Sequence, residues 1–459
     1  MNVTPDLRDY QIEAINNWKN NGYRGLFAMA TGTGKTITSL SCADYLFKVE
    51  GAIHLYILVP TLDLANQWME ETKKFLIKNV ILANSENKNW YTEALSAINT
   101  KDSSYCIIAT YATFLTKRFG DIISKATPQS FLIADEAHNF GTEKHIAVYP
   151  ENIQRRLGLS ATPDRYYDEQ GSLEIYRYFG AEKEFTFKFT MEEAIERNYL
   201  CEYYYYPVIV QLSEEELEEY KSISIKLSKY FNGSTGSFKD NPIVTALLLK
   251  RKRIIHQASG KFDALRKILG ELKNKGLPVK YLLVYVPEGN DDKIDEDDKK
   301  LINTYSRIIA KEFNLSQHQF IGLTTNRQRI LSEFSTGHIA VLTAMKCLDE
   351  GVDIKRAEIA VFCSSTGNPR QFIQRRGRVL RTHPDKKYAT IYDMVVVPSI
   401  TNQYFESTLQ MEKSILQSEL KRVHEFAGLS LNHYQALSVL EHVAKEFNLD
   451  IYAKTDYIA

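Results

Sequence analysis

A glycine-rich loop near the start of the chain has the residue types that bind phosphate groups. The loop Ala30-Thr31-Gly32-Thr33-Gly34-Lys35-Thr36 comes directly after the apolar run Leu26-Phe27-Ala28-Met29. Its glycines let backbone N–H groups turn toward phosphate oxygens, and a helix beginning near Gly34 would point its positive dipole end at the same anion. We expect Lys35 to reach the β- and γ-phosphates of a nucleoside triphosphate and the Thr36 hydroxyl to bind Mg²⁺. Methionine occupies the first glycine position of the general pattern, so the loop alone also fits a glycine-rich turn with an incidental lysine.

Two adjacent acidic residues, about 100 residues further along, supply a second part of the same chemistry. Asp135 and Glu136 follow the apolar run Phe131–Ala134. A carboxylate at the C-terminal end of a parallel strand, beside a phosphate loop, is placed to hold Mg²⁺, and Asp135 fits that role through a water molecule. Glu136 is then the candidate base for the attacking water. His138 has no second histidine or cysteine at ligand spacing, so we do not predict a transition-metal site.

Two sets of short apolar runs must position these residues. Continuous apolar strands separated by helices predict parallel sheets that are covered on both faces, and two sets imply two α/β domains. Only the first set contains a phosphate loop. The first set is Leu26–Ala30, Ile53–Val59, Tyr105–Ala109, Phe131–Ala134 and Leu157–Ser160, and the second is Tyr281–Val286, Gln319–Gly322, Ile339–Thr343, Glu358–Phe362 and Tyr388–Tyr392.

The region between the two sets is predicted to be helical. Ser213 followed by acidic residues is typical of a helix start, and Leu247–His256 is typical of a helix with a basic face. Lys250–Arg253 on that helix fits a solvated surface or a contact with backbone phosphate equally well. The four tyrosines Tyr203–Tyr206 could stack bases, although a strand or hinge that packs alternate rings is favoured. Helices are also expected after Ser399, with Gly428 as a stop and Asn432 as a cap.

Composition limits the class of protein. The chain has 459 residues, 44% hydrophobic, with 57 basic and 57 acidic side chains, which is ordinary for a soluble globular protein of two to three domains. It has neither a run of about 20 apolar residues nor a secretory signal at its start, and its five cysteines lack C-x-x-C pairing. These features favour a reducing cytoplasm. With zero net charge, nucleic acid would have to bind to a local patch or groove.

The order of these motifs resembles that of the superfamily 2 helicases and translocases with a DEAH-type box, over most of the chain. That family tolerates a residue other than glycine at Met29. The matching segments, in the family's order from the adenine-reading motif through motifs I, Ia, Ib, II, III, IV, V and VI, are Leu7–Gln11, Ala30–Thr36, Val59–Thr61 with Gln67 and Trp68, Thr110-Tyr111, Asp135–His138, Ser160–Thr162, Tyr285-Val286, Asp349–Asp353 and Gln374–Arg381.

The resemblance implies an α/β fold with two tandem RecA-like P-loop domains, a helical insert and C-terminal helices. The corresponding ranges are 1–206, 276–400, 207–275 and 401–459. ATP would bind with Mg²⁺ between the two RecA-like domains. The family pattern places Arg8 and Gln11 at the adenine, and Gly351 and Asp353 at the nucleotide.

In the same pattern Arg378 and Arg381 are arginine fingers, groups that are worth about 10³ to 10⁵ in rate. Fingers on a second domain make hydrolysis depend on domain closure, which can move a strand held across both domains. By motif order, that strand should pass near Thr61, Thr110 and Thr343. Taken alone, Arg375–Arg381 would also fit a basic helix that faces solvent or a phosphate backbone.

A finer resemblance is to the XPB-like and restriction-enzyme helicase-subunit branch. Thr325–Arg329, Cys347–Ile354 and Thr366–Phe372 carry it. It implies an ATP-dependent DNA helicase or translocase in repair, restriction or phage defence, with a separate nuclease or other effector as a possible partner. Two alternatives stay open at this point. One is an RNA helicase with the same two RecA-like domains, and the other is a nucleic-acid-gated ATPase that serves as a scaffold for a separate effector.

Overall fold

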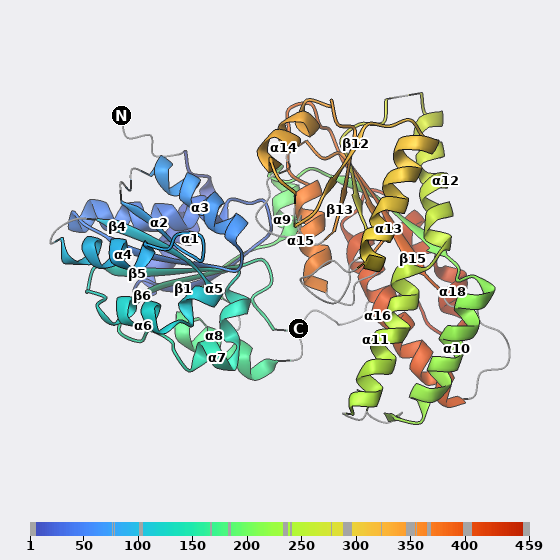
Figure 1. Cartoon of the computed structure of the whole chain (residues 1–459), viewed down its shortest axis with the longest axis horizontal. Coiled ribbons are helices and arrows are strands. Elements are labelled where there is room, and N and C mark those ends of the chain that lie inside the picture. The colour runs from blue at the N-terminus through green and yellow to red at the C-terminus, as the bar shows by residue number, and fades with distance from the viewer. Residues whose placement is uncertain are drawn as a thin grey trace. The chain divides into compact units, whose positions relative to one another are not determined.

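The computed structural model forms two compact units, which Figure 1 shows in blue to green and in green to red. It describes residues 6–75, 77, 79–100, 104–165, 168–181, 185–232, 237–238, 241–276, 278–287, 296–322, 324–345, 354, 356–364, 369–397 and 406–452. Within these ranges, every helix is too short or too polar to cross a membrane.

In the first unit, seven strands among the described residues form one parallel sheet in the order β3-β4-β2-β5-β6-β1-β7. The five predicted strands are confirmed, and β3 and β7 are additional. The strands are β1 (Arg24–Met29), β2 (His54–Val59), β3 (Val80–Ala83), β4 (Tyr105–Thr110), β5 (Ser130–Asp135), β6 (Arg155–Ser160) and β7 (Phe187–Phe189).

Helices cover both faces of this sheet (Figure 1). Helices α1, α2 and α3 pack next to one another, whereas α4, α6 and α8 cover the apolar face formed by alternate residues of β2, β4 and β5. The helices are α1 (Asp9–Asn20), α2 (Lys35–Glu50), α3 (Leu62–Lys74), α4 (Trp90–Asn99), α5 (Tyr111–Phe114), α6 (Lys117–Ser124), η1 (Ala137–Gly141), α7 (Glu143–Ile146), α8 (Glu169–Phe179) and α9 (Met191–Glu196).

In the second unit, six strands of the described chain form another parallel sheet in the order β12-β13-β11-β14-β15-β8. The five predicted strands are again present, and β8 is added at one edge, where it pairs with β15. A separate two-stranded pair consists of β9 (Phe231–Asn232) and β10 (Ser237–Phe238). The strands of the main sheet are β8 (Tyr203–Val210), β11 (Leu282–Tyr285), β12 (Gln317–Phe320), β13 (Val341–Ala344), β14 (Ile359–Phe362) and β15 (Ala389–Val396).

Strand β8 contains the four tyrosines. Tyr203 and Tyr205 are buried, and Tyr204 and Tyr206 are half-buried, as expected for a strand that packs alternate rings. The predicted boundary at residue 206 lies within β8, and the compact units divide between Leu200 and Cys201. The division into four functional domains stays a prediction.

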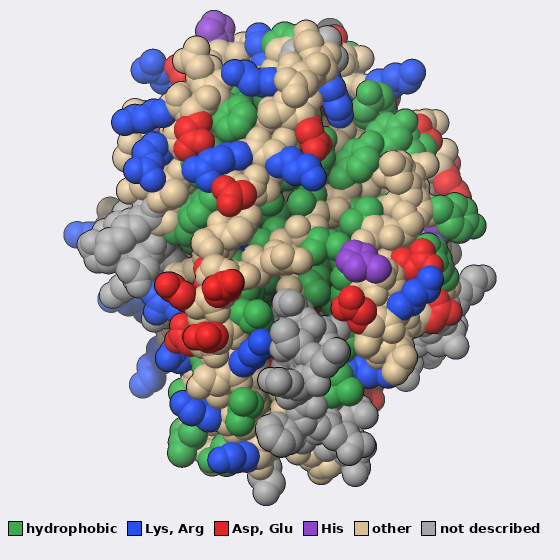
Figure 2. Space-filling view, turned by 90° about the vertical axis from the view of Figure 1, so that its right-hand side faces the viewer, with side chains coloured by type: hydrophobic (Ala, Val, Ile, Leu, Met, Phe, Trp, Pro, Cys, Tyr) green, Lys and Arg blue, Asp and Glu red, His purple; other side chains and the backbone are tan. Residues whose placement is uncertain are grey.

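The helices of the second unit begin and end largely where the sequence signals predict. At the start of α10 the Ser213 hydroxyl accepts from Glu216 N, and Ser213 N donates to the Glu216 carboxylate. Helix α16 ends at Gly428. On the face shown in Figure 2, basic side chains are interspersed with acidic and hydrophobic ones. The helices are α10 (Glu214–Ser228), α11 (Pro242–Gln257), α12 (Gly260–Asn274), α13 (Glu296–Arg307), η2 (Ile308–Glu312), α14 (Arg327–Ser335), α15 (Pro369–Val379), α16 (Glu406–Gly428), α17 (His433–Ser438) and α18 (Glu441–Glu446).

Candidate functional site

The topology of the first sheet brings most of the predicted residues to one edge. Strands β4, β2, β5, β6 and β1 are consecutive neighbours and run parallel, so their carboxyl ends share an edge. The phosphate loop follows β1, and Asp135 ends β5. Thr61 follows β2 and Thr110 ends β4. Ligands of open parallel sheets bind at this edge.

The phosphate loop has the backbone that a phosphate site needs. Gly32 and Gly34 have φ of 88° and 89°, in the left-handed region that favours glycine. Gly34 is also the N-cap of α2, whose first residue is Lys35. The N-terminus of this 16-residue helix therefore opens directly onto the loop, where its N–H groups and dipole can bind an anion.

Side chains hold the loop in shape. The Thr33 hydroxyl donates to Ala30 O at 2.7 Å, and the Tyr10 hydroxyl donates to Thr33 O. Lys35 Nζ donates to Met29 O at 3.2 Å, so the ammonium group lies at the loop. The buried Thr31 hydroxyl has no hydrogen-bond partner among the described residues, which leaves one polar atom of the loop for a ligand. Thr36 lies in the first turn of α2, half-buried.

An aromatic cluster lies beside the loop. The rings of Tyr10 and Phe189 stack with centroids 3.9 Å apart, and the Arg8 guanidinium lies 4.4 Å from the centre of the Tyr199 ring. Gln11 accepts from Arg8 N at 3.0 Å and donates to Gly34 O at 3.4 Å. Arg8 and Gln11 therefore lie next to the phosphate loop, and their contact with adenine stays a prediction.

Sequence reasoning missed Phe189 and Tyr199 in this cluster. Both lie more than 150 residues after Tyr10 in the sequence, yet their rings pack against the Tyr10 ring. The available signal was the density of aromatic residues between 185 and 199, which does not by itself indicate a partner. A Cβ at Gly34 would lie 2.7 Å from Gln11 Nε2, so any other residue there would displace the Gln11 side chain as well as strain the backbone.

Asp135 is buried and held by three donors. Trp68 Nε1 donates to its Oδ2 at 2.8 Å, Glu136 N donates to its Oδ1 at 2.9 Å, and the Tyr111 hydroxyl donates to its carbonyl at 2.8 Å. Burial raises the pKa of the Asp135 carboxyl, while Lys35 and the two hydrogen bonds to the carboxylate oppose this rise. The influence of Lys35 places the predicted metal ligand and the predicted phosphate ligand in one electrostatic environment.

Glu136 adopts a backbone conformation that is unusual for its type. Its φ and ψ are 48° and 54°, in the left-handed region, where a non-glycine residue costs about 1–2 kcal/mol. Residues held in such strain cluster at functional sites. Glu136 Oε2 lies 3.4 Å from His138 Nδ1, which in turn lies 3.2 Å from Ser160 Oγ. Motifs II and III are therefore in contact through these side chains.

The second unit carries the predicted arginines on and after α15. Arg375 donates to Ser364 Oγ at 2.6 Å, and Arg376 donates to Glu425 Oε1 at 3.0 Å. Arg378 is buried, and Arg381, two residues after the end of α15, is half-buried. The predicted nucleotide ligands Gly351 and Asp353 lie outside the described residues. The catalytic roles of Arg378 and Arg381, and the nucleotide contacts of Gly351 and Asp353, stay predictions.

The three threonines predicted to lie near a bound strand differ in their environment. The hydroxyls of Thr61 and Thr110 accept from Leu64 N and Thr113 N, as N-caps of α3 and α5. Thr343 is fully buried, and its hydroxyl lies 3.3 Å from Ser306 Oγ. That a bound strand passes near these three threonines stays a prediction.

Two family descriptions match the chain, one in each unit. "Type III restriction enzyme, res subunit" matches residues 4–165, and "Helicase conserved C-terminal domain" matches residues 260–383. The chain is 28% identical over 401 residues to the DNA 3'-5' translocase XPB2 of Sulfurisphaera tokodaii, which covers 82% of this chain and 79% of the relative. It is 24% identical to a putative DNA 3'-5' helicase Rad25 of Haloarcula marismortui, covering 84% of this chain and 52% of that protein.

Solved structures share the fold. A structure of the ATP-dependent type ISP restriction-modification enzyme LlaBIII bound to DNA aligns with a TM-score of 0.55 and 17% identity, over 93% of this chain and 30% of that enzyme. The helicase domain of Pyrococcus furiosus Hef aligns with a TM-score of 0.50 and 18% identity, over 86% of this chain and 96% of that domain. The chain therefore contains a res-subunit domain and a helicase C-terminal domain, and these domains, with the XPB-like relatives, support a superfamily 2 helicase of the XPB and restriction-enzyme type.

Proposed function

We propose that the chain is an ATP-dependent helicase or translocase that moves along or remodels DNA. The observation that carries this proposal is the shared edge of the first sheet. There the phosphate loop, Asp135 and Glu136 lie next to the strand ends that lead to Thr61 and Thr110. Triphosphate chemistry and a candidate strand contact are thus adjacent in one unit. We favour DNA as the nucleic acid along which the protein moves, because the names of the sequence relatives refer to DNA.

Phosphate and metal binding would fall to the loop and to Asp135. Lys35 and the first N–H groups of α2 would hold the β- and γ-phosphates. Thr36 and Asp135 supply oxygen ligands, the type that Mg²⁺ prefers, and Asp135 would bind through water. When bound, Mg²⁺ would neutralise charge on the transferring phosphoryl group. The buried carboxylate of Asp135, under the influence of Lys35, fits such a site.

Glu136 would orient the attacking water and accept its proton. Its strained backbone follows the end of β5, and its side chain lies beside His138. A carboxylate whose Oε2 lies 3.4 Å from His138 Nδ1 has a restricted position, which suits a group that must align water with the γ-phosphate.

The second unit would complete the reaction. Arg378 and Arg381 would stabilise the charge that develops on the transferred group, and Gly351 and Asp353 would contact the nucleotide. Because the two arginines belong to the second unit, hydrolysis would require the two units to close on ATP. Opening and closing in step with turnover would then move the bound strand.

The test compares ATP hydrolysis without polymer and with single-stranded DNA, duplex DNA and RNA. A Lys35→Ala variant serves as the control that assigns hydrolysis to this site, and strand displacement is measured in parallel. We expect stimulation by DNA that the Lys35→Ala variant lacks.

Each other outcome selects a different function. Stimulation by RNA alone would overturn the proposal in favour of an RNA helicase. No stimulation by any polymer would indicate an ATPase scaffold that acts with a separate effector protein. Stimulation by DNA without strand displacement would identify a translocase, and with displacement a helicase.

A further inference from the structure

Two buried hydrogen bonds connect Asp135 to the elements that follow β2 and β4. Trp68 is fully buried, and its Nε1–H donates to Asp135 Oδ2 at 2.8 Å. Tyr111 is 6% exposed, and its hydroxyl donates to the carbonyl of Asp135 at 2.8 Å. One bond therefore holds the carboxylate and the other holds the main chain of the same residue.

Two bonds to the side chain, from Trp68 and from Glu136 N, fix the direction of the carboxylate. Asp135 Oδ1 accepts from Glu136 N at 2.9 Å, so each carboxylate oxygen already has one donor. A rotation of the carboxylate would break the bond to Trp68 or the bond to Glu136. The lone pairs that remain face a limited set of directions, and a ligand of Asp135 must approach along them.

Trp68 and Tyr111 both belong to helices that begin at the candidate strand contacts. Thr61 is the N-cap of α3, and Trp68 is the seventh residue of that helix, about two turns along. Thr110 is the N-cap of α5, and Tyr111 is its first residue. A displacement of either helix start therefore reaches a donor of Asp135 through a short, packed path.

Packing alone does not require these polar contacts. Trp18 in the same unit is equally buried and donates its Nε1–H to the carbonyl of Arg156 at 3.2 Å, remote from Asp135 in the hydrogen-bond network. Tyr149 likewise donates to the carbonyl of Phe140 at 3.0 Å. An indole and a phenol of the core can thus be satisfied by main-chain carbonyls, whereas Trp68 donates to the candidate metal ligand itself.

We propose that Trp68 and Tyr111 are positioning residues that couple the strand-binding edge to the Mg²⁺–ATP site through Asp135. A strand held at the start of α3 and α5 would set the position of the indole and phenol donors. The indole would in turn set the direction of the Asp135 carboxylate, and the phenol the position of its main chain. By reciprocity, Mg²⁺–ATP bound at Asp135 would change the affinity for DNA by the same factor. This inference rests on the proposed function.

The test uses Trp68→Phe and Tyr111→Phe, which keep a ring and remove the donor. Trp18→Phe and Tyr149→Phe are the matched controls. The first readout is the Mg²⁺ concentration dependence of binding of a fluorescent ATP analogue. The second is the factor by which DNA stimulates hydrolysis, and the third is DNA affinity with and without a non-hydrolysable ATP analogue. Thermal unfolding reports on the fold of each variant.

We expect Trp68→Phe to weaken Mg²⁺-dependent nucleotide binding by about 10-fold or more, the usual effect of removing a partner of a metal ligand. It should also reduce the change in DNA affinity that the ATP analogue causes. Tyr111→Phe should reduce this change with a smaller effect on Mg²⁺, because Tyr111 holds the main chain. The control variants should match the wild type in all three readouts.

The experiment distinguishes failure of this inference from failure of the proposed function. If Trp68→Phe equals Trp18→Phe in Mg²⁺ dependence and in the DNA readouts, while DNA still stimulates the wild type, the inference is overturned and the proposed function stands. If no polymer stimulates the wild type, the proposed function fails and the coupling fails with it. An equal loss of all readouts in the Trp18→Phe control would also overturn the inference, because the effect would then belong to core packing.

Discussion

The two units place their candidate catalytic groups on different kinds of element. The first holds Asp135 and the phosphate loop at strand ends, where neighbouring strands and their following helices fix them. The second places its arginines on and after α15, a helix between β14 and β15. In the first unit the side chains that hold Asp135, namely those of Trp68 and Tyr111, lie within the motifs, whereas in the second the partner of Arg376, Glu425, lies outside every motif.

Helix α16 is the element that holds α15. The guanidinium of Arg376 donates to Glu425 Oε1 at 3.0 Å and to its carbonyl at 3.1 Å, and it lies 4.4 Å from the centre of the Phe426 ring. The Arg422 guanidinium lies 4.4 Å from the centre of the Phe372 ring of α15. Helix α16 thus contacts the arginine-bearing helix α15 through residues that no motif indicates.

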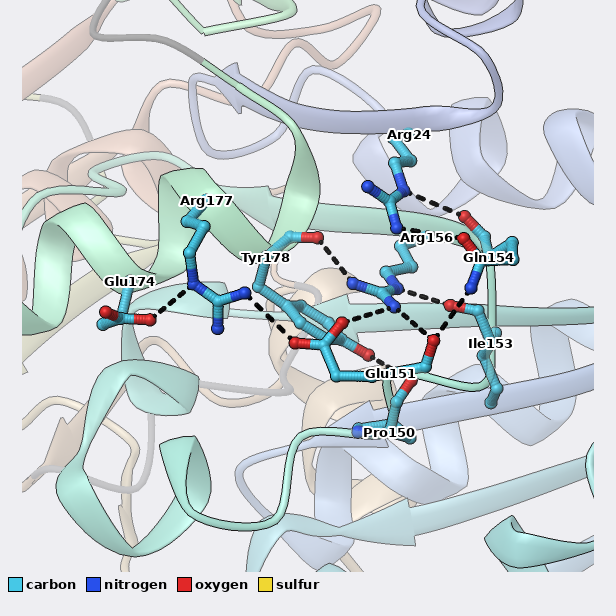
Figure 3. A network of polar contacts seen from close by, with 9 residues as sticks. All are labelled: Arg24, Pro150, Glu151, Ile153, Gln154, Arg156, Glu174, Arg177 and Tyr178. Carbon is cyan, nitrogen blue, oxygen red and sulfur yellow. Dashed lines mark hydrogen bonds and ion pairs between the residues drawn. The ribbon is translucent and has the colours of Figure 1, made fainter.

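A buried arginine is not by itself a sign of catalysis, as Arg156 in the first unit shows. It donates to Tyr178 O and Glu151 Oε2 at 3.1 and 2.8 Å, and its guanidinium lies 4.0 Å from the centre of the Tyr178 ring (Figure 3). Arg156 lies near the start of β6, at the edge of the sheet opposite to the candidate site. Its donors serve a loop and the end of α8, so its role is structural.

The largest effect should come from removing an arginine of the second unit. We expect Arg381→Ala to lower ATP turnover by about 10³ to 10⁵, because an arginine finger stabilises charge that develops only in the transition state. Equilibrium binding of ATP should change much less. Steady-state hydrolysis and nucleotide titration measure the two quantities. A wild-type rate would mean that the finger is assigned to the wrong residue, and Arg378→Ala would then be tested in the same way.

The corresponding change in the first unit should have a somewhat smaller effect. Glu136→Gln keeps the size of the side chain and removes its ability to accept a proton. We expect turnover to fall by about 10² to 10⁴ while ATP binding is retained. Single-turnover hydrolysis and nucleotide titration check both expectations. Turnover that survives the substitution would remove Glu136 from the mechanism.

The sequence predicts strands better than it predicts supporting contacts. Runs buried on both faces, such as Phe131–Ala134, identify central strands because every residue is apolar. The edge strands β3 and β7 were not predicted, because they are only four and three residues long and their burial alternates. Asp135 was predictable from its place after a strand.

The hydrogen bond from Trp68 to Asp135 was not predictable, because the direction of an indole N–H depends on how α3 packs against the sheet. The contact between Arg376 and Glu425 spans 49 residues of sequence, with no motif at its second end. Both contacts arise from tertiary packing, and neither residue pair has a spacing that local periodicity could reveal.

The role of α16 can be tested with Glu425→Ala. The change removes a carboxylate from the guanidinium of Arg376, which is 3% exposed, although Glu425 itself is partly solvated. We expect the free energy of unfolding of the second unit to fall by about 1 kcal/mol. Turnover should fall several-fold with little change in KM for ATP. Glu446→Ala, at the exposed end of α18, is the control for a lost surface carboxylate. If both variants have the same turnover, α16 does not position α15.

The smallest effect concerns pH and separates the stabilities of the two units. His256 in the second unit is buried, and neither ring nitrogen has a hydrogen-bond partner among the described residues. Burial, with the nearby cations Lys261, Lys252 and Arg375, lowers its pKa to about 3. The unfolded chain therefore binds the proton more readily than the folded chain between pH 6.5 and 3, and stability falls as pH decreases through that range.

We expect the second unit to lose about 1 kcal/mol between pH 7.5 and 5.5, and a His256→Leu variant to lose less over the same range. In the first unit, burial also lowers the pKa of His145. That ring keeps a partner, since Thr142 Oγ1 lies 2.6 Å from His145 Nδ1, so its response to acid should be weaker. Thermal unfolding at both pH values, followed by hydrogen exchange of each unit, measures the difference. An equal loss in the wild type and in His256→Leu would show that the acid sensitivity of the second unit arises from groups other than this histidine.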